Sequence, residues 1–230
     1  NKLLMDPYAK AYHRLFALEP GLPDLELDLR RAMLHFVFKW VSDEDRHAHT
    51  LENYLRATGR VDEADLSREM RAAAVKGYAS PHADPMQMAV YTVIQEKATQ
   101  VFYSCLRDAV EEPVLKEVLS ALSADEARHC GFFADLLRVY LAQPGGADYA
   151  KIKEAVVDFK MPLYGTLDHY KRRSIVMMRA AKGYHFRDAF TLIKQAVGRY
   201  ADARVDSRSH TLEDLLGALE TRSNRPTAAA

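Results

Sequence analysis

The 230-residue chain is 48% hydrophobic and 28% charged, which excludes an intrinsically disordered protein and allows one large domain with a substantial core. Its 32 Lys and Arg residues balance its 32 Asp and Glu residues, so the overall positive field expected of a nucleic-acid-binding protein is absent. Two cysteines exclude a disulfide framework and favour a cytoplasmic protein, and no apolar run reaches the roughly 18–20 residues of a membrane span.

The predicted elements are helices along the whole chain, because apolar residues recur at intervals of three and four. A breaker cluster at residues 19–23 ends the first helix, Gly59 ends the second, and Pro85 suits the first turn of a later one. The helix after Pro85 is apolar on most faces, which is typical of a central helix. In chain order we expect helices at about residues 3–18, 24–58, 61–78, 85–111, 113–142, 149–173 with a kink at Pro162, 187–201 and 211–222, then a frayed tail over 223–230.

No segment predicts a strand, and no linker separates two folding units. We therefore expect residues 1–230 to form a single all-α domain, with a four-helix bundle core and additional C-terminal helices. The chain begins at Asn1 rather than Met, so we also expect that an N-terminal segment is missing.

Two of the predicted helices carry the same five-residue pattern, Asp-Glu-x-Arg-His, at residues 43–47 and 125–129. A Glu and a His three residues apart share one helix face, and a carboxylate with an imidazole can hold a transition metal. Random placement predicts about half of one Glu-x-x-His spacing in this chain, so the repeat of the whole pattern is the stronger signal. The alternative is two solvated charged faces on which the arginines form ion pairs.

A paired metal site needs further ligands, which we expect on two other helices. Glu96 lies in the most apolar helix, where metal ligation would neutralise a carboxylate that is costly to bury alone. The alternative is a polar stripe that Glu96 shares with Lys97 and Gln100. On the first helix the candidate is Asp6, for which an N-cap is the other interpretation.

Carboxylates from two helices and Glu-x-x-His from two others make up the ferritin-like arrangement for two iron or manganese ions. Oxygen and imidazole ligands favour these metals over an iron–sulfur cluster. The predicted ligand set is Asp6, Glu44, His47, Glu96, Glu126 and His129.

At these motifs the sequence resembles the soluble acyl-acyl-carrier-protein desaturases, a ferritin-like di-iron family of plant plastids and actinobacteria. The resemblance runs from about residue 6 to residue 165. Residues 40–47 resemble the family's W-T-A-E-E-N-R-H block, 51–62 its L-x-x-Y-L and S-G-R-V-D, 95–99 its Q-E-R-A-T, 124–129 its A-D-E-x-R-H, and 160–162 its M-P kink.

This resemblance implies roles for individual residues. Asp6 falls where the family usually has a glutamate, and the shorter side chain implies a different or longer bond to one iron. Thr99 matches a threonine beside the oxygen site that is thought to help deliver protons. Trp40 and Asp125 match positions that support the ligands, although core packing is a compatible interpretation of Trp40. The residues that match iron ligands are Glu44, His47, Glu96, Glu126 and His129.

The implied activity is oxygen-dependent desaturation of an acyl chain on acyl carrier protein. The resemblance also implies two iron ions, a ferredoxin-type electron donor and a homodimer in the bacterial cytoplasm. Asp6 keeps open a hydroxylase or other oxygenase on a carrier-bound substrate. A non-catalytic ferritin-like metal-binding protein is the third hypothesis, with Thr99 and the Trp40 block against it. A late basic cluster could dock the acidic carrier or be a solvated face, and consists of Lys171, Arg172, Arg173, Arg179 and Lys182.

Overall fold

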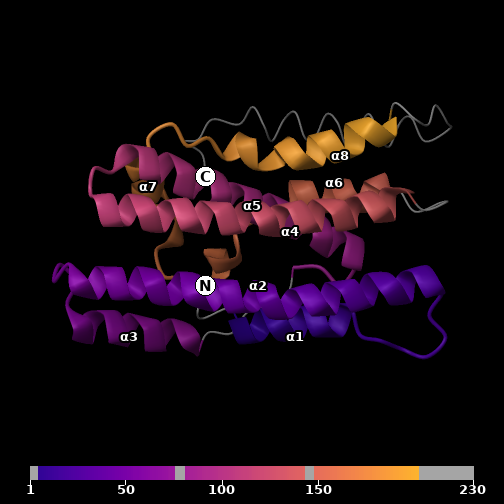
Figure 1. The fold of residues 1–230 in the computed structure, drawn as a ribbon, viewed down its shortest axis with the longest axis horizontal. Helices are drawn as coiled ribbons and strands as arrows, with labels where there is room; N and C mark the ends of the chain where they lie inside the picture. Colours follow the sequence, from indigo (N-terminus) through magenta and orange to yellow (C-terminus); the bar gives the residue numbers. More distant parts are fainter. Residues whose placement is uncertain (1–4, 76–80, 143–147, 202–230) are drawn as a thin grey trace. The chain divides into compact units, whose positions relative to one another are not determined.

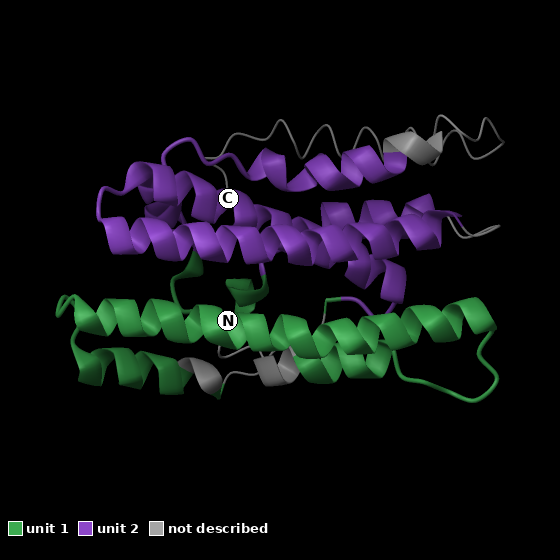
Figure 2. Ribbon diagram, viewed as in Figure 1, with its two compact units in different colours: residues 1–81, 162–170 green, residues 82–161, 171–230 purple. Residues whose placement is uncertain are grey.

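Helices form every regular element of the part of the chain that the computed structural model describes, residues 5–75, 81–142 and 148–201. The predicted all-α class is therefore confirmed, and no strand occurs in these residues. The chain divides into two compact units, residues 1–81 with 162–170 and residues 82–161 with 171–230 (Figure 2). We call them unit 1 and unit 2. None of the described helices is long and apolar enough to cross a membrane.

Unit 1 is built on one long helix, α2 (Asp24–Ala57), against which the shorter α1 (Met5–Leu15) packs (Figure 1). At the end of α2 the backbone of Gly59 has φ of +63°, a conformation that glycine adopts without strain, and its N–H donates to the carbonyl of Arg56. The chain then continues into α3 (Glu63–Ala74). The unit also includes the short 3₁₀ helix η1 (Pro162–Gly165), which comes much later in the sequence.

Unit 2 is organised around α4 (Pro85–Ala109), which is the central helix that its apolar sequence predicts. Every residue from 86 to 96 is buried, because α4 contacts neighbours on several sides (Figure 1). Asp84 caps the helix by accepting from the N–H groups of Met86 and Gln87, at 3.0 and 3.1 Å. The contacting elements are α5 (Pro113–Ala142), α6 (Tyr149–Val157), η2 (Phe186–Phe190) and α8 (Thr191–Ala201).

The single helix expected over residues 149–173 is wrong. The structure has α6 ending at Val157, then η1, then α7 (Tyr170–Ala180). Pro162 lacks an N–H and disfavours helical geometry at the residue before it, so it separates the elements rather than kinking one helix. His169, with φ of +56°, adds a second break before α7.

The other predicted boundaries differ by a few residues. The first helix ends at Leu15 rather than residue 18. Residues 187–190 belong to the 3₁₀ helix η2, where the Phe186 and Phe190 rings meet edge-on with centroids 5.5 Å apart. The helix expected at 211–222 and the frayed tail at 223–230 lie outside the described residues.

Candidate metal centre

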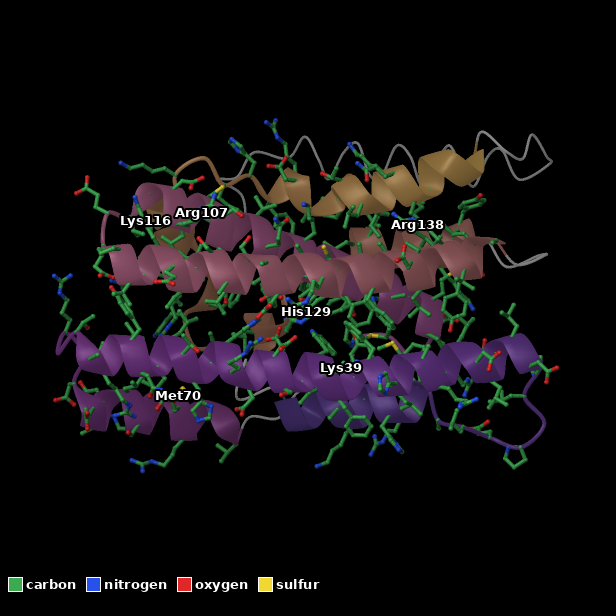
Figure 3. The ribbon with its side chains drawn as sticks, viewed as in Figure 1. Lys39, Met70, Arg107, Lys116, His129 and Arg138 are labelled. Atoms are coloured by element: carbon green, nitrogen blue, oxygen red, sulfur yellow. The ribbon has the colours of Figure 1, made fainter. Side chains whose placement is uncertain are left out.

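Unit 2 brings three of the predicted ligands together. Glu96 on α4 and Glu126 and His129 on α5 each offer a ligand atom, and these atoms lie within 4.8 Å of one another. The Nδ1 atom of His129 lies 3.2 Å from Oε2 of Glu126 and 3.4 Å from Oε2 of Glu96. All three residues are only 1% exposed. Figure 3 labels His129, which α5 carries near its midpoint.

The packing of α4 on α5 sets this convergence. The hydroxyl groups of Ser104 and Ser123 lie 2.8 Å apart and fix where the two antiparallel helices face each other. Glu96 lies eight residues before Ser104 on α4, and His129 lies six residues after Ser123 on α5. Because the helices are antiparallel, this register sets Glu96 opposite His129. Glu126 precedes His129 by three residues, so it shares the face of α5 that is turned toward α4.

The chemistry of this cluster suits a cation. Two carboxylates and an imidazole with their ligand atoms this close can share one positive ion, which would lower the cost of burying the carboxylate charges. A divalent metal ion would balance both. Two donors bound at about 2.0–2.2 Å and nearly at right angles lie about 3.0 Å apart, close to the 3.2 and 3.4 Å observed. Carboxylate oxygen with imidazole nitrogen is a donor set suited to iron or manganese, so the residues fit such an ion.

Unit 1 buries the corresponding Glu-x-x-His pair on α2. Glu44 is 7% exposed and His47 is 2% exposed, and Nδ1 of His47 lies 3.8 Å from Oε1 of Glu44. Trp40 lies one turn before Glu44 and is 1% exposed. Its ring meets Tyr12 of α1 edge-on, with centroids 5.0 Å apart, which confirms the core-packing interpretation of Trp40.

In both copies of the five-residue pattern, the arginine is exposed to solvent while the Glu and the His are buried. In each copy the Asp and Arg form a pair three residues apart, with N–O distances of 2.6 Å for Asp43–Arg46 and 2.7 Å for Asp125–Arg128. Both arginine side chains are more than half exposed, whereas the Glu and His of each copy are buried. The solvated-face alternative therefore holds for the arginines and fails for the predicted ligands.

The polar-stripe alternative fails for Glu96 as well. The ammonium of Lys97 donates to Oε1 of Gln100 at 2.6 Å, on a half-buried part of α4, while Glu96 is almost fully enclosed. A partner of Glu96 that the sequence analysis missed is Gln95, whose Nε2 donates to Oε1 of Glu96 at 3.1 Å. The sequence signal that could have indicated this contact is the position of Gln95 directly before Glu96 in the Q-E-K-A-T motif.

The side chain of Asp6 lies outside the described residues, but α1 fixes the level of its backbone. Tyr12 contacts Trp40, and the carbonyl of Ala17 accepts from Arg30, so α1 runs antiparallel to α2. Asp6 lies six residues before Tyr12, which is about 9 Å along α1. Glu44 and His47 lie four and seven residues after Trp40, which is about 6–10 Å along α2 in the same direction. The backbone of Asp6 is thus level with that pair, and its role as a ligand stays a prediction.

Two further predicted residues, Thr99 and Asp125, each have a hydrogen-bond or ion-pair partner within their own helix. The hydroxyl of Thr99 donates to the carbonyl of Gln95 at 3.0 Å, within α4. Asp125 is 8% exposed and pairs with Arg128. Proton delivery by Thr99 and ligand support by Asp125 stay predictions.

Cys130, next to His129, is buried, and desolvation raises the pKa of its thiol to about 11. Glu96 and Glu126 also raise that pKa, against an opposite effect of Lys97. A thiol with a pKa this high stays protonated at neutral pH, so Cys130 is an inert buried side chain there.

The fold and these buried residues define an all-helical protein with a candidate carboxylate–histidine metal centre. The family model for fatty acid desaturase matches residues 11–226, so the chain belongs to that family, a family of oxidoreductases.

Individual relatives agree with this assignment. DesA2 of Mycobacterium tuberculosis (strain CDC 1551 / Oshkosh), whose name places it among acyl-[acyl-carrier-protein] desaturases, is 33% identical over 43% of this chain and 36% of its own length. Stearoyl-[acyl-carrier-protein] 9-desaturase 6 of Arabidopsis thaliana is 31% identical over 47% of this chain and 29% of its own. Acyl-[acyl-carrier-protein] 6-desaturase of Thunbergia alata is 28% identical over 70% and 40%. The chain thus spans about a third of the length of these relatives.

Proposed function

We propose that this protein is a di-iron desaturase that introduces a double bond into an acyl chain carried on acyl carrier protein. The observation that carries the proposal is the buried cluster of Glu96, Glu126 and His129, whose possible ligand atoms lie within 4.8 Å of one another. Family membership supplies the reaction type, and the names of the relatives supply the carrier.

In this proposal the metal ligands come from both copies of the repeated pattern. Glu96, Glu126 and His129 hold one part of the centre, and Glu44 and His47, with Asp6, hold the other. The support is the matching burial of Glu and His in each copy and the ferritin-like ligand pattern in the sequence. When bound, two iron ions would supply the oxygen activation that removal of hydrogen from an unactivated methylene group requires.

The residues of the chain would contribute position and exclusion of water. Gln95 holds Oε1 of Glu96, which leaves Oε2 directed at His129 and at a shared cation. The Ser104–Ser123 contact keeps α4 and α5 in register, so the donors are in place before a metal arrives. Thr99 lies one turn after Gln95, and its hydroxyl is our candidate for holding a proton near the site.

The proposed partners are acyl carrier protein, a ferredoxin-type electron donor, dioxygen and a second copy of the chain. The proposed location of the protein is the cytoplasm. Acyl carrier proteins are acidic, and α7 offers them a matching charge. Its cations are all exposed, and the helix has no acidic residue and no buried side chain. These cations are Lys171, Arg172, Arg173 and Arg179.

The test is mass spectrometry of acyl chains on acyl carrier protein after incubation with the iron-loaded protein, ferredoxin, a reductant and oxygen. Loss of two hydrogens from the chain is the expected result. Gain of one oxygen would instead establish the hydroxylase alternative, and no change together with accumulation of ferric oxide would favour the storage alternative.

Matched variants connect that result to the site. Glu126→Ala and His129→Ala should lose both iron and turnover, whereas Glu117→Gln, an exposed change on the same helix, should lose neither. Full iron content and turnover in both site variants would refute the ligand assignment.

A further inference from the structure

A groove lies between α1 and α2 of unit 1 and has a volume of about 350 Å³. Small-molecule sites in proteins are typically about 300–1,000 Å³ and mostly apolar, with a few polar groups that orient the ligand. The lining of this groove is of that kind, because five of its eight residues are apolar, three are basic and none is acidic. These residues are Ala9, Lys10, His13 and Arg14 of α1 and Leu34, Val37, Phe38 and Val41 of α2.

The apolar part of the groove is a stripe on α2. Leu34, Phe38 and Val41 follow one another at intervals of four and three residues, so they share one face of the helix. Val37 is 5% exposed and forms the floor, whereas the ring of Phe38 is 76% exposed and forms an outer wall. Figure 3 labels Lys39, the next residue along α2, and so locates this wall.

The length of this stripe matches one hydrocarbon chain. The seven residues from Leu34 to Val41 cover about 10 Å of helix. An extended chain of about nine carbons has the same length, because each carbon–carbon bond is about 1.5 Å. A single unbranched chain would therefore cover the apolar stripe and bury the exposed side of the Phe38 ring.

The basic side of the groove comes from α1. Lys10, His13 and Arg14 lie at spacings of three and four residues, share one face of α1 and are all exposed. Residues 9–17 contain no acidic side chain, so the field on this side of the groove is positive. A guanidinium group can hold a carboxylate through two parallel hydrogen bonds, which makes Arg14 the anchor for an anion.

The packing of α1 on α2 places Arg14 along the groove. The ring of Tyr12 contacts Trp40. The carbonyl of Ala17 accepts a hydrogen bond from Arg30 at 2.7 Å. Arg14 lies between Tyr12 and Ala17 in the sequence, so its backbone is level with the part of α2 between residues 30 and 40.

The two ends of the groove differ in charge. Asp45 lies one helical turn beyond Val41, and its side chain is 44% exposed. A carboxylate at that end would face a like charge, whereas at the Leu34 end it would meet Arg14. An anionic ligand is therefore oriented with its charge near Leu34 and its chain directed toward Val41.

We propose that this groove binds one single-chain anionic amphiphile, a soluble long-chain carboxylate, with its carboxylate on Arg14 and its chain along Leu34, Phe38 and Val41. A concave site of this volume takes one chain, whereas the surface of a lipid bilayer is flat. The site belongs to unit 1 alone, and the proposal holds whatever reaction the metal centre performs.

The first test is calorimetric titration of the full chain with sodium decanoate below its micelle-forming concentration. Decanoate should saturate a site. Decanol has the same chain without the charge and should bind about tenfold more weakly or less, and decyltrimethylammonium should not bind there. Equal binding of all three, or a decanoate titration that does not saturate, would overturn the proposal.

Variants connect the binding to the groove. Arg14→Glu should weaken decanoate binding about tenfold or more and leave decanol binding unchanged, and Arg14→Lys should fall between wild type and Arg14→Glu. Phe38→Asp should weaken the binding of both ligands. The matched controls are Lys116→Glu and Val114→Asp at exposed positions of α5, which should bind as wild type does. An Arg14→Glu variant that keeps the wild-type affinity for decanoate would refute the site.

A photolabel locates the ligand independently of affinity. A decanoate with a diazirine at the end of its chain should, after illumination, label the part of α2 around Val41, and Arg14→Glu should remove that label. Labels confined to other parts of the chain would overturn the assignment.

Vesicles distinguish a soluble carboxylate from a membrane surface. Vesicles of phosphatidylglycerol should retain the full chain no better than vesicles of phosphatidylcholine do. Retention on phosphatidylglycerol that Arg14→Glu abolishes would assign the groove to an anionic bilayer and overturn the soluble ligand.

Discussion

Replacing Glu96 with Gln tests whether the buried cluster of unit 2 exists to hold a cation. The change keeps the shape of the side chain and removes one negative charge. Ligand atoms of Glu96 and Glu126 lie within 4.8 Å, and two unit charges at that distance repel by about 3.5 kcal/mol at an effective dielectric constant of about 20. His129 offsets part of this repulsion. We therefore expect the metal-free variant to be more stable than the metal-free wild type by about 2 kcal/mol.

The assay is thermal unfolding of protein stripped with a chelator and then titrated with Mn²⁺, which avoids oxidation during heating. A gain of about 2 kcal/mol corresponds to a rise of about 4–8 °C in the Tm of a chain of this size. Added Mn²⁺ should raise the Tm of the wild type strongly and that of Glu96→Gln much less, because a ligand that binds only the folded state stabilises it. Glu117→Gln makes the same charge change at an exposed position of α5 and should behave as wild type.

The outcomes distinguish a metal ligand from a structural carboxylate. If Glu96 served only to accept hydrogen bonds, its replacement would leave the metal-free protein equally stable or less stable, and Mn²⁺ would shift both proteins alike. Either observation would refute the charge argument, and with it the reason for placing a cation between α4 and α5.

Three further changes test other parts of the structure. Gln95→Leu should weaken Mn²⁺ binding at least about tenfold in a titration, because the hydrogen bond that orients Glu96 is lost, whereas Gln100→Leu should not. Trp40→Ala should lower the free energy of unfolding by about 3–5 kcal/mol in urea, because its buried ring packs on Tyr12. Asp84→Ala should cost about 1–2 kcal/mol at pH 7 by removing the cap of α4 and the Lys151 contact. Burial opposes the ionisation of Asp84, but the hydrogen bonds from Lys151 and the backbone outweigh it and lower the pKa of Asp84 below 3.8. The destabilisation caused by Asp84→Ala should therefore disappear as the pH falls through that lowered pKa.

The sequence predicted the long helices well because each has its own local signals. For α2 the start at Asp24 was predicted and the end missed by one residue, since a Pro-rich breaker and a left-handed glycine bound a continuous apolar period. The region after Val157 was predicted poorly because apolar spacing continues there while Pro162 and the positive φ of His169 interrupt the backbone. Helical periodicity records which faces are apolar, but it does not record where one helix is replaced by several short ones.

The burial of the candidate ligands could be predicted for the same local reason. Glu-x-x-His at three-residue spacing needs only a helix to share a face, and both copies bury the pair as expected. The hydrogen bonds between polar side chains are of another kind. Gln95 donates to a neighbouring side chain, and Gln87 reaches across to Glu154 on α6 at 2.9 Å, over 67 residues of sequence. Rotamers and long-range packing decide such contacts, and neither leaves a periodic trace in one sequence.

The burial pattern also explains why the repeated motif is longer than its ligands. In each copy the guanidinium of the Arg lies at the surface and keeps its charge in water, while its Asp partner is half-buried in the first copy and buried in the second. The pair therefore offsets the Asp charge without competing for the buried imidazole, since an arginine turned inward would neutralise the glutamates and remove their need for a cation. Exchanging Arg128 for Ala should consequently leave metal affinity nearly unchanged, whereas a second positive charge inside, as in Cys130→Lys, should abolish it.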